Sequence, residues 1–153
     1  MKQIYLTKLG FDEFEAELAE LNTLFGQITE RVRTARESGD LGENAEYTAA
    51  CLELESVKYR ATKVKDILQN AQVIKKPLKD NGVQLGSTVK MKGNGQEKLF
   101  IVVDTVEADP LNGKLSSESP IGRALLGKKE GDMIEIKTPG KTVQYVITTI
   151  MHI

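Results

Sequence analysis

The stretch FDEFEAELAELNTLFGQITERVRTA, residues 11–35, decides the fold of this chain. Its apolar residues recur at alternating intervals of three and four positions, which is the heptad pattern of a coiled-coil helix. The members of this first seam are Phe11, Phe14, Leu18, Leu21, Phe25, Ile28, Val32 and Ala35. Thr7 precedes the stretch as its predicted N-cap. The pattern predicts a long helix with one apolar face, which a second helix must cover.

A second seam with the same period follows. Its members are Tyr47, Ala50, Leu54, Val57, Ala61, Val64, Leu68 and Ala71. We expect this helix to end near Ile74, because Pro77 cannot continue it. Residues 37–42 contain two glycines and predict a short turn, which makes the two helices antiparallel neighbours. Residues 8–74 should therefore form a helical hairpin with arms about 44 Å long.

Opposite charges follow the two predicted arms. The first arm carries the acids Glu13, Glu17, Glu20 and Glu30, and the second carries the bases Lys58, Arg60, Lys63 and Lys65. An antiparallel hairpin brings these groups alongside each other. Each exposed pair is worth less than about 1 kcal/mol, but together they favour one register.

The period changes in the second half of the chain. Residues 88–91, 98–103, 133–137 and 142–147 are short segments that alternate or are rich in β-branched side chains, which predicts strands. Ser119 as N-cap, Pro120 as first residue and Gly127 as terminator predict one short helix. We predict an α+β fold with a coiled-coil hairpin in residues 1–75, a linker in 76–82 and a small α+β domain in 83–153.

Composition restricts the classes of function. The 153 residues carry 21 basic and 22 acidic side chains, whereas a free-standing DNA-binding protein usually has a basic excess. One Cys and one His exclude a disulfide framework and zinc-finger spacing. The longest apolar run has five residues, and the N-terminus lacks the apolar segment of a signal peptide. We expect a cytoplasmic protein without a membrane partner.

Acidic residues gather in the predicted turn. Asp40, Glu43 and Glu46 are each three positions apart, a spacing that places side chains on one side of a beginning helix. Such carboxylates can hold Mg²⁺, which typically takes one or two carboxylates together with water and phosphate oxygens. The same Asp-x-x-Glu spacing is also typical of a capping box, in which the acids only stabilise the helix start. The residues alone leave both interpretations open.

The end of a two-helix rod has no cavity that could exclude water or surround a substrate. If the acids take part in chemistry, the reaction must occur inside a pocket of another macromolecule. The predicted length of the arms would allow the acids to reach into a deep channel of that partner.

The residues ESGDLGENAEY, 37–47, closely resemble the tip of the bacterial Gre transcript-cleavage factors, and in particular of the GreA-type branch. The similarity continues in NAQVI at 70–74, SPIGRALLGK at 119–128 and IKTPG at 136–140. It covers essentially the whole chain in the same order.

The resemblance implies a C-terminal domain of FKBP-like fold that docks on bacterial RNA polymerase, and a hairpin that enters its secondary channel. It implies that Asp40 and Glu43 are the catalytic residues, which hold Mg²⁺ jointly with polymerase and orient water for hydrolysis of the extruded RNA 3′ end. The chain would thus raise an activity of polymerase without being an enzyme alone. We expect it to be a monomer.

The resemblance also assigns supporting residues, which are Arg36, Asn44, Glu46, Ser119 and Pro120. A cation at position 36 would meet RNA phosphates, and the side chains at 44 and 46 would support the tip. The serine and proline would lie near the polymerase-docking surface.

Three neighbouring positions complete the predicted tip. Tyr47 is expected to pack in the seam. Many GreA-type sequences have an arginine where this chain has Cys51, and Gly42 stands where the family often has a larger polar residue. The loss of the arginine favours action on short backtracked RNA.

Three alternatives remain open on the sequence. The chain could be a channel-binding paralogue that inhibits polymerase without stimulating cleavage. It could be an FKBP-like prolyl isomerase or chaperone, although only Phe100 and Tyr145 are aromatic from residue 80 onward. It could also be a structural coiled coil in which Asp40 and Glu43 serve only as caps.

Overall fold

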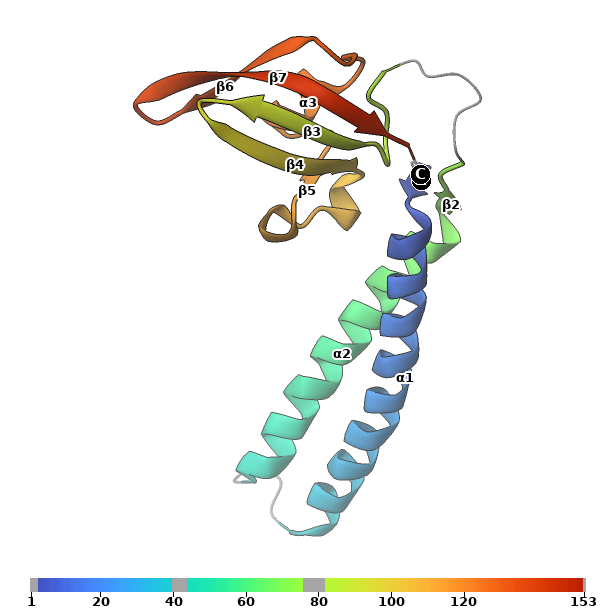
Figure 1. Ribbon diagram of the computed structural model, residues 1–153. Helices are drawn as coiled ribbons and strands as arrows, with labels where there is room; N and C mark the ends of the chain where they lie inside the picture. The colour runs from blue at the N-terminus through green and yellow to red at the C-terminus, as the bar shows by residue number, and fades with distance from the viewer. Residues whose placement is uncertain (1–2, 40–43, 76–81, 153) are drawn as a thin grey trace. The chain divides into compact units, whose positions relative to one another are not determined.

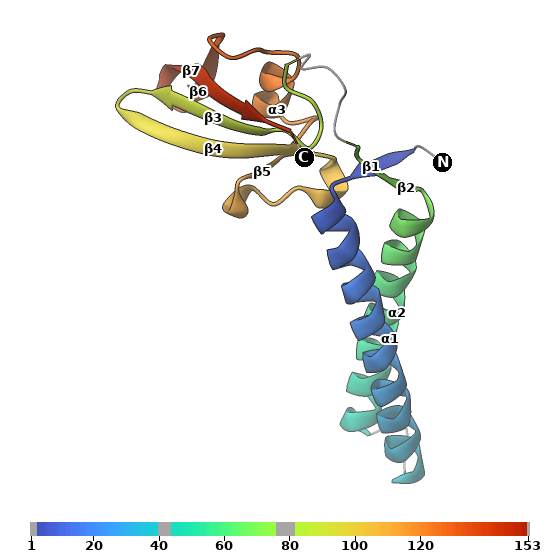
Figure 2. The same cartoon turned by 45° about the vertical axis from the view of Figure 1, so that its right-hand side comes forward.

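The computed structural model describes residues 3–39, 44–75 and 82–152, which form two compact units (Figures 1 and 2). One unit contains the residues from Phe11 to Asn70, and the other contains those up to Gly10 together with those from Ala71 onward. The fold is α+β, as predicted: a helical hairpin is followed by a β-sheet domain. No helix in the described ranges is long and apolar enough to cross a membrane.

The hairpin consists of α1, Lys8–Glu37, and α2, Ala45–Gln69, which lie antiparallel and side by side in Figures 1 and 2. The buried seam residues are Phe14, Ile28 and Ala35 in α1 and Ala50, Val57 and Val64 in α2. The other predicted seam positions are partly buried, except Phe25, which is 38% exposed. The heptad spacing therefore predicted the apolar face of each helix correctly.

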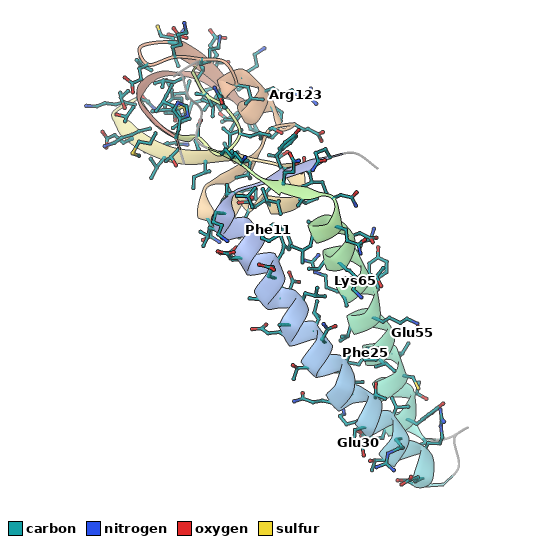
Figure 3. All side chains as sticks on the ribbon, turned by 90° about the vertical axis from the view of Figure 1, so that its right-hand side faces the viewer. Phe11, Phe25, Glu30, Glu55, Lys65 and Arg123 are labelled. Atoms are coloured by element: carbon teal, nitrogen blue, oxygen red, sulfur yellow. The ribbon has the colours of Figure 1, made fainter. Side chains whose placement is uncertain are left out.

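Ion pairs between the helices support their antiparallel register. Arg60 Nε donates to Glu17 Oε1 at 2.6 Å, a pair that belongs to the predicted acidic and basic sets. Nearer the turn the polarity reverses, and Arg31 Nη1 donates to Glu53 Oε2 at 2.9 Å. Glu30 instead binds an arginine of its own helix, so the predicted charge pattern is realised only in part. The exposed Glu55 lies on the outside of α2 (Figure 3).

The second predicted helix is shorter than expected. It ends at Gln69 rather than near Ile74, and Asn70 forms its C-cap by donating its backbone N–H to the carbonyl of Asp66. The residues that follow form β2, Ala71–Val73, which pairs in parallel with β1, Ile4–Leu6. The helix ends early because residues 71–73 form their backbone hydrogen bonds with β1 instead of within a longer helix.

These short strands belong to the same unit as the C-terminal residues, although they flank the hairpin in sequence. The predicted domain bounds, with the hairpin in residues 1–75, stay a prediction. Of the predicted linker, residues 76–81 lie outside the described part of the chain.

The C-terminal residues form a five-stranded sheet with strand order β5-β4-β3-β7-β6. Its strands are β3 Thr88–Gly93, β4 Gln96–Val103, β5 Lys114–Ser116, β6 Met133–Thr138 and β7 Lys141–Met151. All four predicted strands are present, and β5 was not predicted. Neighbouring strands are antiparallel except β4 and β5, which are parallel. Two single-turn 3-10 helices, η1 Thr105–Glu107 and η2 Pro110–Asn112, connect β4 to β5.

The short helix α3, Pro120–Leu125, begins as predicted, with Ser119 as its N-cap. The core of this unit contains Val89, Met91, Val102, Leu125, Ile134 and Ile147. Tyr145 also belongs to it, and Phe100 packs against it. Both aromatic side chains therefore contribute to the packing of this core.

Candidate functional site

The candidate site is the hairpin tip, where α1 ends at Glu37 and α2 begins at Ala45. The two residues predicted to be catalytic, Asp40 and Glu43, fall in residues 40–43, which lie outside the described part of the chain. Their role therefore stays a prediction. The described residues on both sides of them show how the two helix ends are held.

Asn44 joins the two helix ends. Its Nδ2 donates to the carbonyl of Ala35 at 2.8 Å, and its Oδ1 accepts from the backbone N–H of Tyr47 at 3.0 Å. The first contact reaches the last turn of α1, and the second caps the first turn of α2. A single amide side chain thus clamps both ends at the tip.

The same contact decides which residue caps α2. The N-cap is Asn44, and α2 begins at the next residue. The capping alternative assigned this role to Asp40, with Glu43 as its partner. Since Asn44 makes the cap, α2 does not depend on Asp40 for it.

The arginines of the last turns of α1 have different partners. Arg31 pairs with Glu53 across the hairpin, and Arg33 pairs with Glu30 and Glu37 on its own helix. The exposed Arg36 has an aromatic partner instead: its guanidinium carbon lies over the Tyr47 ring, 5.9 Å from the ring centre.

These contacts change the acid–base properties of one pair. The hydrogen bond from Arg33, reinforced by its positive charge, lowers the pKa of Glu30 below its ordinary value. The same hydrogen bond raises the pKa of Arg33. Both side chains therefore remain charged near neutral pH. The N–H groups of the Arg33 guanidinium are bound to the carboxylates of Glu30 and Glu37.

Two further predicted positions lie on α2. Glu46 is exposed in the first helical turn, where a carboxylate interacts favourably with the helix dipole. Cys51 is partly exposed and lies one turn beyond Tyr47. The structure thus places Arg36, Asn44, Glu46 and Tyr47 around the tip.

The predicted docking residues lie in the other unit. Ser119 Oγ accepts from the backbone N–H of Gly122 at 3.0 Å and donates to the carbonyl of Ser116 at 2.7 Å. These contacts give Ser119 a structural role at the start of α3. Pro120 is exposed and therefore accessible to a partner.

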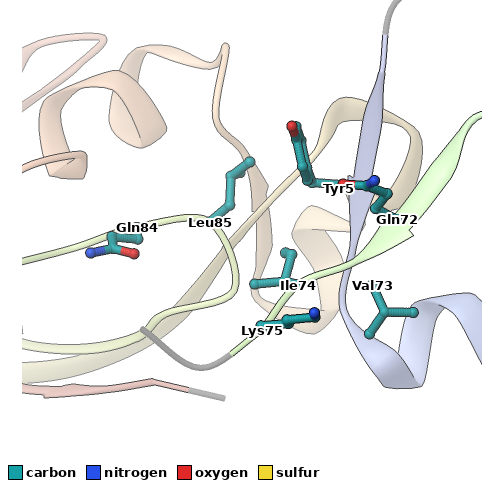
Figure 4. Close-up of a pocket in the computed structure, with 7 residues that line it drawn as sticks. All are labelled: Tyr5, Gln72, Val73, Ile74, Lys75, Gln84 and Leu85. Atoms are coloured by element: carbon teal, nitrogen blue, oxygen red, sulfur yellow. The ribbon is translucent and has the colours of Figure 1, made fainter. Parts of the chain in front are cut away.

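A cavity of about 730 Å³ lies in the unit that contains the sheet, and none of its described lining residues belongs to the tip (Figure 4). It is lined by Tyr5, Gln72, Val73, Ile74, Lys75, Gln84 and Leu85. Unlike the tip motif, the described lining residues of this cavity include no carboxylate. Among the described side chains, no group of three or more His, Cys, Asp or Glu could hold a metal ion.

The contact between Arg36 and Tyr47 was not predicted, since the heptad pattern assigned Tyr47 to packing alone. A signal was present in the sequence. The two residues stand at equal sequence distances on either side of residues 40–43, and antiparallel helices bring such positions together.

Comparison with known proteins assigns both halves of the chain to one family. Residues 4–73 match the family described as "Transcription elongation factor, N-terminal". Residues 78–152 match the family described as "Transcription elongation factor, GreA/GreB, C-term".

Individual relatives are similar over nearly the full length. The chain is 39% identical to transcription elongation factor GreA of Thermotoga petrophila over 99% of both chains. It is 41% identical to GreA of Thermosipho africanus over 97% of both chains. Among solved structures it is similar to GreA factor homolog 1 (Gfh1) of Thermus thermophilus, with a TM-score of 0.48, 27% identity, and coverage of 98% of this chain and 99% of that one.

Proposed function

Because the chain belongs to the GreA/GreB family of transcription elongation factors, we propose that it stimulates RNA polymerase to hydrolyse the 3′ end of backtracked RNA. The family assignment makes it an elongation factor acting on RNA polymerase. Cleavage of the extruded RNA would return a paired 3′ end to the active centre and rescue an arrested complex. The observation that carries the proposal is the acidic sequence Asp40 to Glu43, which joins the two paired helices of the hairpin.

The hairpin supports this role by its construction. Two buried seams and the cross-helix pairs make it a rod, and Asn44, which follows the acids in sequence, joins its helix ends. A rod end has no walls of its own that could exclude water. We therefore assign the reaction to a pocket of polymerase and not to the chain alone. Similarity to the Gre factors implies that the hairpin reaches the polymerase active centre through the secondary channel.

The acids fit a divalent cation by their chemistry. Asp40 and Glu43 offer carboxylate oxygens, which are the ligands that Mg²⁺ prefers, and Mg²⁺ commonly shares its shell with a partner and with phosphate. When held jointly with polymerase, the ion would favour ionisation of the attacking water and neutralise charge on the phosphate. The two acids would hold and orient that water. That Asn44 already caps α2 supports a role for them beyond helix stability.

The remaining predicted residues complete the proposal. Arg36 would contact phosphates of the extruded RNA, and Glu46 would support the tip. Ser119 and Pro120 would belong to the docking surface of the C-terminal unit. The protein would act as a monomer in the cytoplasm, where bacterial RNA polymerase works.

The test uses stalled, backtracked complexes of bacterial RNA polymerase with end-labelled RNA and Mg²⁺. The wild-type chain should release short 3′ fragments rapidly. The double variant Asp40→Asn/Glu43→Gln preserves side-chain size and removes both charges, so it should lower the stimulated rate by about 100-fold while remaining folded and bound. Glu55→Gln, which removes an exposed charge from the outside of α2, is the matched control and should behave as wild type.

The possible outcomes separate the alternatives. Normal stimulation by the double variant would contradict the assignment of Asp40 and Glu43. Inhibition of polymerase by the wild-type chain, without any cleavage, would identify an inhibitory paralogue instead.

A further inference from the structure

The arginines near the end of α1 have two kinds of partner among the described residues: a carboxylate or an aromatic ring. Arg31 and Arg33 bind carboxylates, and a carboxylate accepts from the N–H groups at the edge of the guanidinium plane. The guanidinium carbon of Arg36 instead lies over the Tyr47 ring, 5.9 Å from the ring centre, which is within the range of a cation–π contact. No carboxylate in the described part of the chain pairs with Arg36, so among these residues the ring contact leaves its N–H groups available for a further acceptor.

The ring beneath Arg36 is itself fixed in place. Tyr47 is partly buried as the first member of the second seam, between α2 and α1. Its backbone N–H is held by Asn44 Oδ1, and the same amide binds the carbonyl of Ala35, the neighbour of Arg36. The backbone of both partners is therefore tied to one clamp, and the cation and ring are set opposite each other across the tip.

We propose that Tyr47 is a positioning residue, whose ring holds the Arg36 guanidinium with its N–H edge free to bind a phosphate of the extruded RNA. This inference rests on the proposed function, because it needs RNA to reach the tip. A guanidinium fork binds phosphate oxygens through two parallel hydrogen bonds, and a cation already held in place loses less rotational freedom on binding. The ring thus contributes to phosphate binding without touching the RNA.

The test compares two substitutions of Tyr47 in the full chain. Tyr47→Phe keeps the ring, and Tyr47→Leu keeps an apolar seam residue but removes the ring. We expect Phe to preserve cleavage and Leu to lower it by about two- to fivefold at limiting factor concentration, which corresponds to an exposed cation–π contact. Arg33→Gln is the matched control, because its guanidinium is occupied by carboxylates, and it should leave cleavage unchanged.

A double-mutant cycle distinguishes positioning from a structural role. In an Arg36→Gln background, Tyr47→Leu should have no further effect, since the cation that the ring holds is gone. An equal loss in both backgrounds would overturn the proposal and leave Tyr47 as a packing residue. Full activity of Tyr47→Leu in the wild-type background would overturn it as well.

A second measurement does not depend on polymerase. In the free protein, NMR relaxation of the Arg36 side-chain Nε should show a more mobile guanidinium in Tyr47→Leu than in wild type or Tyr47→Phe. Equal mobility in all three would overturn the proposal. If wild type stimulates no cleavage at all, the proposed function fails and the RNA role fails with it, whereas the relaxation data still show whether the ring holds the cation.

Discussion

Gly10 and Gly26 both lie inside α1, yet the structure gives them opposite surroundings. A side-chain carbon on Gly10 would lie 2.5 and 2.7 Å from the carboxylate oxygens of Glu107, whereas one on Gly26 would meet nothing within 4 Å. Glu107 is only 8% exposed, and its oxygens accept from the backbone N–H of Thr7 at 2.9 Å and from its hydroxyl at 2.6 Å. Gly10 therefore makes room for a buried carboxylate that binds the first turn of the helix.

The two glycines give a matched pair of substitutions. Gly26→Ala should stabilise the protein by up to about 1 kcal/mol, because alanine is the better helix former and nothing obstructs it. Gly10→Ala should destabilise it by about 1–3 kcal/mol, because displacement of the Glu107 carboxylate leaves a buried charge without its hydrogen bonds. Urea unfolding followed by circular dichroism measures both changes. A stabilising Gly10→Ala would show that the carboxylate moves aside without cost.

Among the elements, the two long helices were predictable because their signal is repeated. Each heptad adds an independent apolar pair at the same spacing, so an error at one position, such as the exposed Phe25, does not hide the pattern. The Thr7 cap was predictable for a related reason, since its hydroxyl accepts from the backbone N–H of Gly10, three residues away. Such contacts depend only on local sequence.

The elements that were missed depend on distant partners. The strands β1, β2 and β5 have three residues each, which is too short to show a period. The pair β1 and β2 joins Ile4 to Ala71 across the whole hairpin sequence, so the local sequence around either strand does not indicate its partner. Glu107 likewise binds a residue 100 positions away, and nothing near it in the sequence indicates that contact.

The ion pair between Glu30 and Arg33 in α1 should make the stability of the protein depend on pH. The pKa of Glu30 is lowered by the hydrogen bond and charge of Arg33, so the folded-state value lies below that of the unfolded chain. The contribution of this pair to stability is therefore present above the unfolded-state pKa, and is lost as the pH falls through the folded-state value. In Arg33→Gln, the pKa of Glu30 should return toward its ordinary value.

The measurement is a carbon-13 NMR titration of the Glu30 carboxyl group in both proteins. Raised salt provides the control, because the pair is exposed and screening should reduce the charge contribution in the wild type. Identical titration curves for wild type and Arg33→Gln would contradict the assigned cause.

For the whole molecule, the sequence motif named the residues of the candidate site, but it did not reveal the contacts among those that the structure describes. The acids Asp40 and Glu43 were found from a motif between two seams, and they stay a prediction. Asn44 bonds to Ala35 and Tyr47 and so joins the two helix ends, while its expected support of the tip stays a prediction. The pairing of Arg36 with Tyr47 could not be derived from the heptads, because both helix ends must be placed before a ring and a cation meet.

The chain also distributes its two proposed tasks over its two units. The acids lie in the segment between α1 and α2, and the proposed docking residues Ser119 and Pro120 lie in the unit that contains the sheet. A change at the tip should therefore leave docking intact. This separation gives a prediction that concerns the whole molecule.

An excess of the Asp40→Asn/Glu43→Gln variant should inhibit cleavage stimulated by the wild-type chain, because it occupies polymerase without supplying the acids. With equal affinities, a tenfold excess should leave about one tenth of the stimulated rate. Adding Pro120→Glu should relieve the inhibition, since the charge falls on an exposed position where the first turn of α3 tolerates an acid. The measurement is a cleavage assay with fixed wild type and increasing variant. If the folded double variant fails to compete, docking and chemistry are not separated between the two units. If inhibition persists with Pro120→Glu, Pro120 is not part of the docking surface.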